Sequence, residues 1–260
     1  MKKATILAGL AAFLALGLPL HGVADEHETP GPLTDVWYMV PKQGMEAEFE
    51  AAVKEHVRFR VDSGETQEWS IYVPVIGHNM SIYQFRSCCH TFADLDTFQA
   101  EAMEKGLGAH WNENVHQYVD HYHHYLERND WEHSHMPEDG GPYKYYGVTS
   151  RVWKQGAGPG PNEARKQFSK IAKEQGWADD DHQWLWLSRI GGKPMMMLVS
   201  PMDNFADMAP SDPSFYDFLS ERLGSEAAAD ALFEEFDSGF ESSDYTVWTE
   251  REDLTAAGDD

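Results

Sequence analysis

Apolar positions in the first half of this chain change their period several times, and each change predicts an element. Residues 35–40 form a short, β-rich apolar run. Residues 45–61 then carry apolar side chains four apart, which is the stripe of an amphipathic helix. Two more apolar runs, 69–76 and 80–88, are separated by turn residues at 77–79, the pattern of a hairpin. The half therefore begins strand, helix, strand, strand.

A second helix and a last strand complete this half. Thr91 is predicted to cap the helix, because Asp94 stands where a capping box places its acidic partner. We expect the helix to run to about Lys105. A helical stretch over 110–118 and a strand over 122–128 should follow.

The second half repeats this order. The run Val36-x-x-x-Val40-x-Lys42-Gln43-Gly44 recurs as Val148-x-x-x-Val152-x-Lys154-Gln155-Gly156, Trp69 matches Trp184, and Phe92-Ala93-Asp94 matches Phe205-Ala206-Asp207. Such internal repetition indicates two similar units in one chain. The elements predicted for the second unit are a strand over 148–153, a helix capped by Asn162 and running to Gln175, strands over 184–190 and 194–200, a helix capped by Asn204, a helix over 226–236 and a strand over 245–249.

Each unit thus has the β-α-β-β-α-β order of the ferredoxin-like fold, in the α+β class. A sheet with one wet face would alternate apolar and polar residues. Here both faces are apolar, since Trp184 and Trp186 alternate with Leu185 and Leu187. We therefore predict two tandem ferredoxin-like units whose antiparallel sheets pack face to face as a pseudo-dimeric α/β barrel. Trp69 and Trp184 should then occupy equivalent, substantially buried positions.

This element order, repeated over residues 35–253, resembles the dimeric α/β-barrel superfamily in a tandem fused form. That superfamily includes antibiotic-biosynthesis-type monooxygenases, haem-degrading and haem-binding members, and NIPSNAP-like proteins. The chain shows no catalytic signature of any single branch. The resemblance implies that a ligand would lie between helices and sheet or inside the barrel.

The first residues have the pattern of a secretory signal peptide. Lys2 and Lys3 precede an apolar stretch over 6–20, and small residues up to Ala24 offer a cleavage site. We expect a periplasmic or secreted protein, with a retained N-terminal anchor as the alternative. The predicted organisation is 1–24 signal peptide, 25–34 tail, 35–130 first unit, 131–145 linker, 146–253 second unit and 254–260 acidic tail.

A formal net charge of −24 limits the partners of this protein. Such an acidic surface repels nucleic acid and anionic lipid. We therefore expect no nucleic-acid partner and no stable membrane insertion after signal removal, whereas a small molecule or a homo-oligomer is compatible with the charge. No glycine-rich phosphate loop follows a strand in the required way, so no nucleotide cofactor is expected.

Eight of the thirteen histidines lie between residues 90 and 135, in the first unit and the start of the linker, and both cysteines lie in the first unit. His121 and His123 share a strand face, and imidazole binds zinc, copper and haem iron. The alternative is a packed or solvated surface. Cys88 and Cys89 could supply soft-metal thiolates or form a bridge with each other. The metal or haem candidates are Cys88, Cys89, His90, His116, His121 and His123.

Polar residues in the first unit also replace apolar ones of the second. Gln84 and Arg86 correspond to Met197 and Val199, which indicates a polar pocket. The ligand-binding candidates are Tyr72, Gln84, Arg86, His123 and Tyr125. We therefore predict an exported small-molecule-binding protein, with haem or a transition metal among its candidate ligands. The alternatives are a cofactor-independent monooxygenase acting on an aromatic substrate and a structural or interaction protein without a catalytic site.

Overall fold

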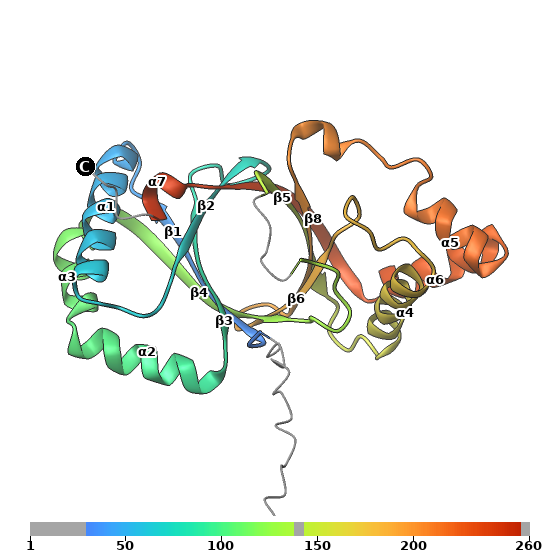
Figure 1. Ribbon diagram of the computed structural model, residues 1–260, viewed down its shortest axis with the longest axis horizontal. Coiled ribbons are helices and arrows are strands. Elements are labelled where there is room, and N and C mark those ends of the chain that lie inside the picture. The colour runs from blue at the N-terminus through green and yellow to red at the C-terminus, as the bar shows by residue number, and fades with distance from the viewer. Residues whose placement is uncertain (1–29, 138–142, 256–260) are drawn as a thin grey trace, which may run out of the picture.

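Eight antiparallel strands close into one barrel in the computed structural model, which describes residues 30–137 and 143–255 (Figure 1). The order around the barrel is β1-β3-β2-β8-β5-β7-β6-β4. Each half of the chain supplies four neighbouring strands, and the pairs β2–β8 and β4–β6 join the halves. The strands are β1 (Leu33–Pro41), β2 (Ser70–Ile76), β3 (Tyr83–His90), β4 (Val119–Asn129), β5 (Tyr145–Trp153), β6 (Leu185–Ile190), β7 (Met195–Met202) and β8 (Phe240–Glu250).

The helices lie on the outside of the barrel, in two groups on opposite sides (Figure 1). The first unit contributes α1 (Glu46–Asp62), α2 (Phe92–Glu104), α3 (Leu107–Asn114) and the 3-10 turn η1 (His116–Tyr118). The second contributes α4 (Gly160–Glu174), η2 (Phe205–Met208), α5 (Phe215–Leu223), α6 (Glu226–Ser238) and α7 (Glu252–Thr255). The predicted tandem ferredoxin-like barrel is confirmed. The predicted signal peptide lies outside the described residues.

Two of the three predicted helix N-caps, Thr91 and Asn204, are confirmed, and the third is wrong. Thr91 and Asp94 form the expected capping box, in which Thr91 Oγ1 accepts from the Asp94 amide at 3.2 Å. Asn204 caps as predicted, but it begins only the short η2. The expectation that Asn162 caps α4 is wrong, because the helix already starts at Gly160 with Pro161 in its first turn. Proline favours that position because it has no N–H to leave unpaired.

Aromatic side chains fill the layer between helices and sheet in the second unit. Phe168 and Phe236 pack at 5.4 Å between ring centroids, and Trp186 lies against Phe236 at 6.1 Å. Trp184 is only 9% exposed, whereas Trp69, at the equivalent position directly before β2, is only partly buried. The expected equivalence therefore holds for the two positions, and the expected burial holds fully for Trp184 alone. This difference is the first sign that the units are packed differently.

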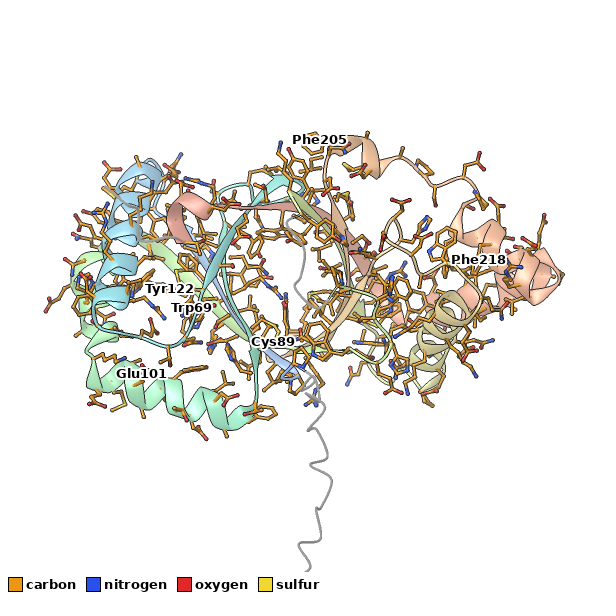
Figure 2. The ribbon with its side chains drawn as sticks, viewed as in Figure 1. Trp69, Cys89, Glu101, Tyr122, Phe205 and Phe218 are labelled. Atoms are coloured by element: carbon orange, nitrogen blue, oxygen red, sulfur yellow. A yellow bond between two sulfur atoms is a disulfide. The ribbon has the colours of Figure 1, made fainter. Side chains whose placement is uncertain are left out.

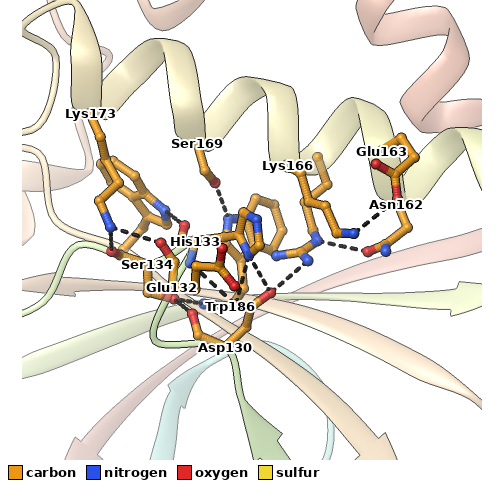
Figure 3. A network of polar contacts seen from close by, with 12 residues as sticks. Asp130, Glu132, His133, Ser134, Asn162, Glu163, Lys166, Ser169, Lys173 and Trp186 are labelled. Atoms are coloured by element: carbon orange, nitrogen blue, oxygen red, sulfur yellow. Dashed lines mark hydrogen bonds and ion pairs between the residues drawn. The ribbon is translucent and has the colours of Figure 1, made fainter. Parts of the chain in front are cut away.

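The residues that follow the last strand of each unit contact the first helix of the other unit. After β8, Leu254 of α7 is fully buried against the first unit, and Arg251 forms a two-pronged ion pair with Glu50 of α1 at 2.7 and 2.9 Å. After β4, Asp130 pairs with Arg165 of α4 at 2.6 Å (Figure 3). Leu254, the first residue of the predicted acidic tail, is thus docked on the first unit. Within the described ranges, no helix is long and apolar enough to span a membrane.

Candidate functional site

A cavity of about 1120 Å³ lies in the first unit, between α1–α3 and the outer face of the sheet. Small-molecule sites usually occupy about 300–1,000 Å³, so this space would hold a sizeable ligand. Figure 2 places Trp69 and Tyr122 in this layer and Glu101 on α2 beside it. The phenylalanine, tyrosine and tryptophan residues of its wall are Trp37, Trp69, Tyr72, Phe85, Phe98, Trp111 and Tyr122.

The cavity arises because α2 does not pack down on the sheet. No residue of α2 is buried, although Leu95, Phe98 and Ala102 line the cavity. In the second unit, α5 buries Phe218 and α6 buries Phe236. The same layer is therefore closed by rings in one unit and open in the other.

Two polar contacts lie on the cavity wall. His124 Nε2 lies 2.6 Å from Asp35 Oδ1, and its ring stacks on Trp37 at 4.0 Å. Arg60 is ion-paired with Glu65 and lies over the Trp69 ring at 5.1 Å. Burial raises the pKa of the Glu65 carboxyl. These contacts hold a few polar side-chain groups in place on a wall that also carries several aromatic rings.

A histidine pair forms another part of the wall. His56 of α1 is 3% exposed, and its Nδ1 lies 3.0 Å from Nδ1 of His110 on α3. His110 stacks on Phe59 at 4.1 Å between centroids, and His56 meets the edge of Trp111 at 5.1 Å. Burial, together with the charge of Arg60, lowers the pKa of His56 to about 3. His56 is therefore a neutral imidazole across the ordinary pH range.

Haem, one of the candidate ligands, would need an iron ligand from the protein, commonly a histidine. His124 has its Nε2 engaged by Asp35, whereas the contact of His56 with another histidine of the described ranges is made through Nδ1, and His56 lines the cavity. Metal-binding histidines usually have the second ring nitrogen hydrogen-bonded, as His110 provides here. The residues therefore fit a haem ligand at His56, which the sequence analysis did not select.

The five predicted ligand-binding residues all lie on the barrel-inward face of their strands. Tyr72 and Gln84 are ladder partners, and Gln84 donates to Tyr38 Oη at 2.7 Å. Arg86 is paired at 2.8 Å with a fully buried glutamate on β4. The His123 and Tyr125 rings stack at 6.2 Å. Tyr72 and Arg86 also line the cavity, whereas Gln84, His123 and Tyr125 do not.

The predicted thiolate ligands are not available, because Cys88 and Cys89 form a disulfide with each other. Cys88 contributes to the cavity wall in this bridged form. Figure 2 marks Cys89 close to the lower end of the first-unit sheet. A soft-metal site at this pair is therefore ruled out in the bridged protein, since the thiolate is the metal ligand.

The predicted histidine ligands do not converge. The His121 and His123 rings are 5.3 Å apart on the inward face. His116 instead contacts Tyr122 Oη at 2.9 Å on the helix side, and His90 contacts Ser87 Oγ at 2.7 Å near the end of β3. Over the described ranges, no group of three or more histidine, cysteine, aspartate or glutamate side chains could hold a metal ion. The spacing of these histidines in the sequence was misleading. His121 and His123 face the barrel interior, whereas His116 lies on the helix side of the sheet.

Sequence reasoning missed the residues that distinguish the cavity. The signal was present in the first helix, where His56 and Arg60 continue the spacing of Phe49 and Val53 along one face. Polar residues on an apolar helix stripe are placed in the core layer by the same periodicity that places the apolar ones. That pattern could have identified them.

Comparisons with known proteins support the fold. No family model matches the chain, and no curated protein matches its sequence. A mutant chlorite dismutase from Candidatus Nitrospira defluvii in complex with cyanide matches with a TM-score of 0.50 and 10% identity, over 87% of this chain and 95% of that one. The chain has the dimeric α/β-barrel fold.

Two further solved structures give similar values. An anthrone oxidase-like protein matches with a TM-score of 0.46 and 14% identity, over 88% of this chain and 94% of that one. A protein from Lactobacillus acidophilus NCFM, provisionally assigned as a monooxygenase, matches with a TM-score of 0.48 and 10% identity, over 85% and 94% of the two chains. At sequence identities this low, the similarity to these structures shows the fold alone. Function has to be argued from the site itself.

Proposed function

We propose that the first unit binds a planar, mainly aromatic small molecule in the cavity between α1–α3 and the sheet. The observation that carries the proposal is the difference between the two units. Rings fill this layer in the second unit, whereas about 1120 Å³ stays open in the first. An open space inside a packed domain loses dispersion contacts, which a ligand of matching shape restores.

The wall chemistry supports a flat aromatic ligand. The Trp37 and Trp111 rings provide apolar contact area and favour stacked or edge-on neighbours. Asp35 and Arg60 on this wall are each already paired, so these two groups can orient a ligand by hydrogen bonds and do not act on it as free charges. Export is part of the proposal, supported by the residues before Ala24.

Haem belongs to this class of ligand, and His56 would hold it, with its Nδ1 in contact with His110. Bound haem would supply redox chemistry at its iron. The chain's own part would be to present a neutral imidazole and to exclude water with the aromatic wall. An aromatic substrate oxidised without any cofactor is the rival activity.

The test is a binding titration that uses β-naphthol, its methyl ether and hemin as probes, followed by tryptophan fluorescence. Val57 lines the cavity, so Val57→Phe places a ring in the space and should weaken binding at least about fivefold, as overpacking a filled site costs about 1–3 kcal/mol. Ala227→Phe, on the exposed side of α6, is the matched control and should bind like wild type.

The outcomes separate the alternatives. Equal binding by wild type and Val57→Phe, or no binding of any probe, would contradict the proposal. A Soret band in protein purified from its host would identify haem as the occupant. Oxygen uptake with an aromatic probe and no metal would favour the oxygenase.

A further inference from the structure

We propose that the Cys88–Cys89 disulfide is a redox-active site, which takes two electrons from a small uncharged dithiol that reaches it through the cavity. This is a second activity, and it does not require the aromatic ligand to be bound. The bridge joins two neighbours in the chain. A disulfide stabilises a fold mainly by closing a loop of the unfolded chain, and a bridge between neighbours closes the shortest loop. Its contribution to stability is therefore smaller than that of a bridge between distant residues.

The equivalent strand of the second unit shows that the fold does not need the bridge. Pro201 and Met202 of β7 take the place of the two cysteines, and they pair one to one with residues of β5. In the first unit, the pairing of β3 with β1 skips Cys89, which is an extra residue without a partner on β1. One-residue bulges of this kind are frequent beside active sites. The bulge and the bridge are thus features of the first unit alone.

The bulge stands at an open edge of the sheet. The ladder between β2 and β3 ends at the pair of Ser70 and Arg86, so the last residues of β3 pair with β1 only. Cys88 is exposed and lines the cavity, whereas Cys89 is half-buried and does not belong to the cavity wall. A thiol inside the cavity therefore meets Cys88 before Cys89 (Figure 2).

A buried amide is aimed at one of the two sulfurs. Asn129 of β4 is 5% exposed, and its Nδ2 donates to Cys88 Sγ at 3.6 Å. Thr34 Oγ1 donates to the other end of the same amide, Asn129 Oδ1, at 3.1 Å and so fixes its direction. A charged sulfur accepts a hydrogen bond more strongly than a neutral one. Asn129 therefore favours the state in which Cys88 is a thiolate.

The surroundings select the class of thiol. The net charge of −24 repels anionic thiols, and Asp35, the ladder partner of Ser87, lies on the cavity wall beside the bridge. Leu95 and Phe98 of α2 line the same cavity with apolar surface. A small, uncharged dithiol fits both features.

The exchange balances in two steps of thiolate attack. In the first, one thiolate of the dithiol attacks Cys88 Sγ, the bond between the two cysteines breaks, and its electron pair stays on Cys89 Sγ. In the second, the other thiolate attacks the dithiol sulfur that is now bound to Cys88. That bond breaks, and its electron pair stays on Cys88 Sγ, to which Asn129 donates. The dithiol leaves as a disulfide, having lost two electrons, and its two protons pass through water to the cysteine sulfurs.

The first experiment follows reduction of the full-chain protein by dithiothreitol, an uncharged dithiol, in the absence of oxygen. Samples quenched with N-ethylmaleimide are analysed by mass spectrometry, and labels should appear on both cysteines. Far-UV circular dichroism should keep its folded signal, since the sister strand is paired without a bridge. A bridge that resists dithiothreitol in the folded protein would overturn the proposal. Loss of the folded signal on reduction would make the bridge structural and would also overturn it.

The second experiment tests Cys88 as the exchanging sulfur. Cys89→Ser leaves Cys88 as a single thiol, which should form a mixed disulfide with hydroxyethyl disulfide, an uncharged probe. The matched control is Met208→Cys in a protein that also carries Cys88→Ser and Cys89→Ser, because Met208 is exposed and lies outside the cavity wall. Cys88 should react at least about threefold faster, since a roughly tenfold larger thiolate share is partly offset by lower nucleophilicity. A rate no higher than that of the control would contradict the proposal.

The third experiment tests Asn129 as a positioning residue in the Cys89→Ser protein. Asn129→Ala removes the donor, so the ultraviolet absorbance of the Cys88 thiolate at neutral pH should fall about tenfold. A packing effect alone would not change this spectroscopic signal. An absorbance that is equal with and without the Asn129 amide would overturn its role.

The class of substrate is tested with an anionic disulfide. Dithiodiglycolate should react with Cys88 more slowly than hydroxyethyl disulfide does, by a larger factor than at the Met208→Cys control. A preference of Cys88 for the anionic probe would overturn the proposed class. None of these measurements uses the aromatic ligand, so their failure and the failure of the proposed function are distinguishable.

Discussion

At the scale of single residues, the barrel interior depends on one carboxylate. Glu127 of β4 is fully buried, Arg86 of β3 pairs with it at 2.8 Å, and Arg189 of β6 lies 3.8 Å away. Arg189 also covers the Tyr125 ring at 4.3 Å. Burial raises the pKa of the neighbouring Tyr38 to about 12, so that phenol stays neutral. Glu127 is thus the balancing charge for arginines from both units.

Removing this charge should be costly. Glu127→Gln leaves Arg86 and Arg189 in the barrel without a counter-charge, and breaking a buried pair in this way costs about 3–5 kcal/mol. Urea unfolding at neutral pH measures the loss. Glu234→Gln on the exposed face of α6 should change the free energy of unfolding by less than about 0.5 kcal/mol. A Glu127→Gln protein as stable as wild type would show that the arginines are hydrated inside the barrel.

At the scale of elements, α2 is the least anchored of the long helices. It buries no residue, and its Met103 is 79% exposed, although the Thr91 capping box fixes its first turn. Helices with few buried contacts open locally at low free-energy cost. Amide hydrogen exchange should therefore be faster in α2 than in α6.

Ligand binding should change this exchange. If β-naphthol contacts the cavity-lining Leu95 and Phe98, a concentration ten times its Kd should slow α2 exchange by about tenfold, because only the closed helix completes the site. Exchange in α6 serves as the internal control. Equal protection of α2 and α6 without ligand would mean that α2 is already firmly packed.

The element scale also shows what the sequence could predict. Periodicity located the strands and α1, and the Thr91 and Asn204 signals located two helix starts, because these depend on neighbours close in the chain. The open layer under α2 could not be read in this way. It depends on how far a helix stands from a sheet, and the apolar residues of α2 have the same pattern whether they pack or line a cavity. The His56–His110 contact joins two helices, which no local spacing reports.

At the scale of the whole molecule, the two units are held by more than shared strands. Arg251, which follows β8, pairs with Glu50 of α1 and with Asp253. Asp130, which follows β4, pairs with Arg165 of α4 (Figure 3). The charges are reversed between the two contacts, since the arginine stands after the strand in one and on the helix in the other. Each contact ties the end of one unit to the first helix of the other.

The first of these contacts should weaken in acid. The hydrogen bonds from Arg251 lower the pKa of Glu50 below its ordinary 4.5, and those from the same arginine lower the pKa of Asp253. A carboxyl that is more acidic when folded adds stability above its unfolded pKa and loses it as the pH falls through the folded value. The contribution should therefore be complete at neutral pH and decline as the pH falls below 4.5.

Arg251→Gln tests this contact at the level of the whole fold. With both Glu50 and Arg251 about one quarter exposed, the variant should lose about 1–2 kcal/mol of unfolding free energy at pH 7, between the values for surface and buried pairs. Urea unfolding at an acidic pH below 4.5 should show a smaller difference from wild type, because the share of protonated Glu50, which no longer pairs with the guanidinium, grows as the pH falls through its folded pKa. Arg222→Gln, from an exposed pair on α5, should match wild type at both pH values. A difference that stays constant with pH would show that Arg251 acts through packing alone.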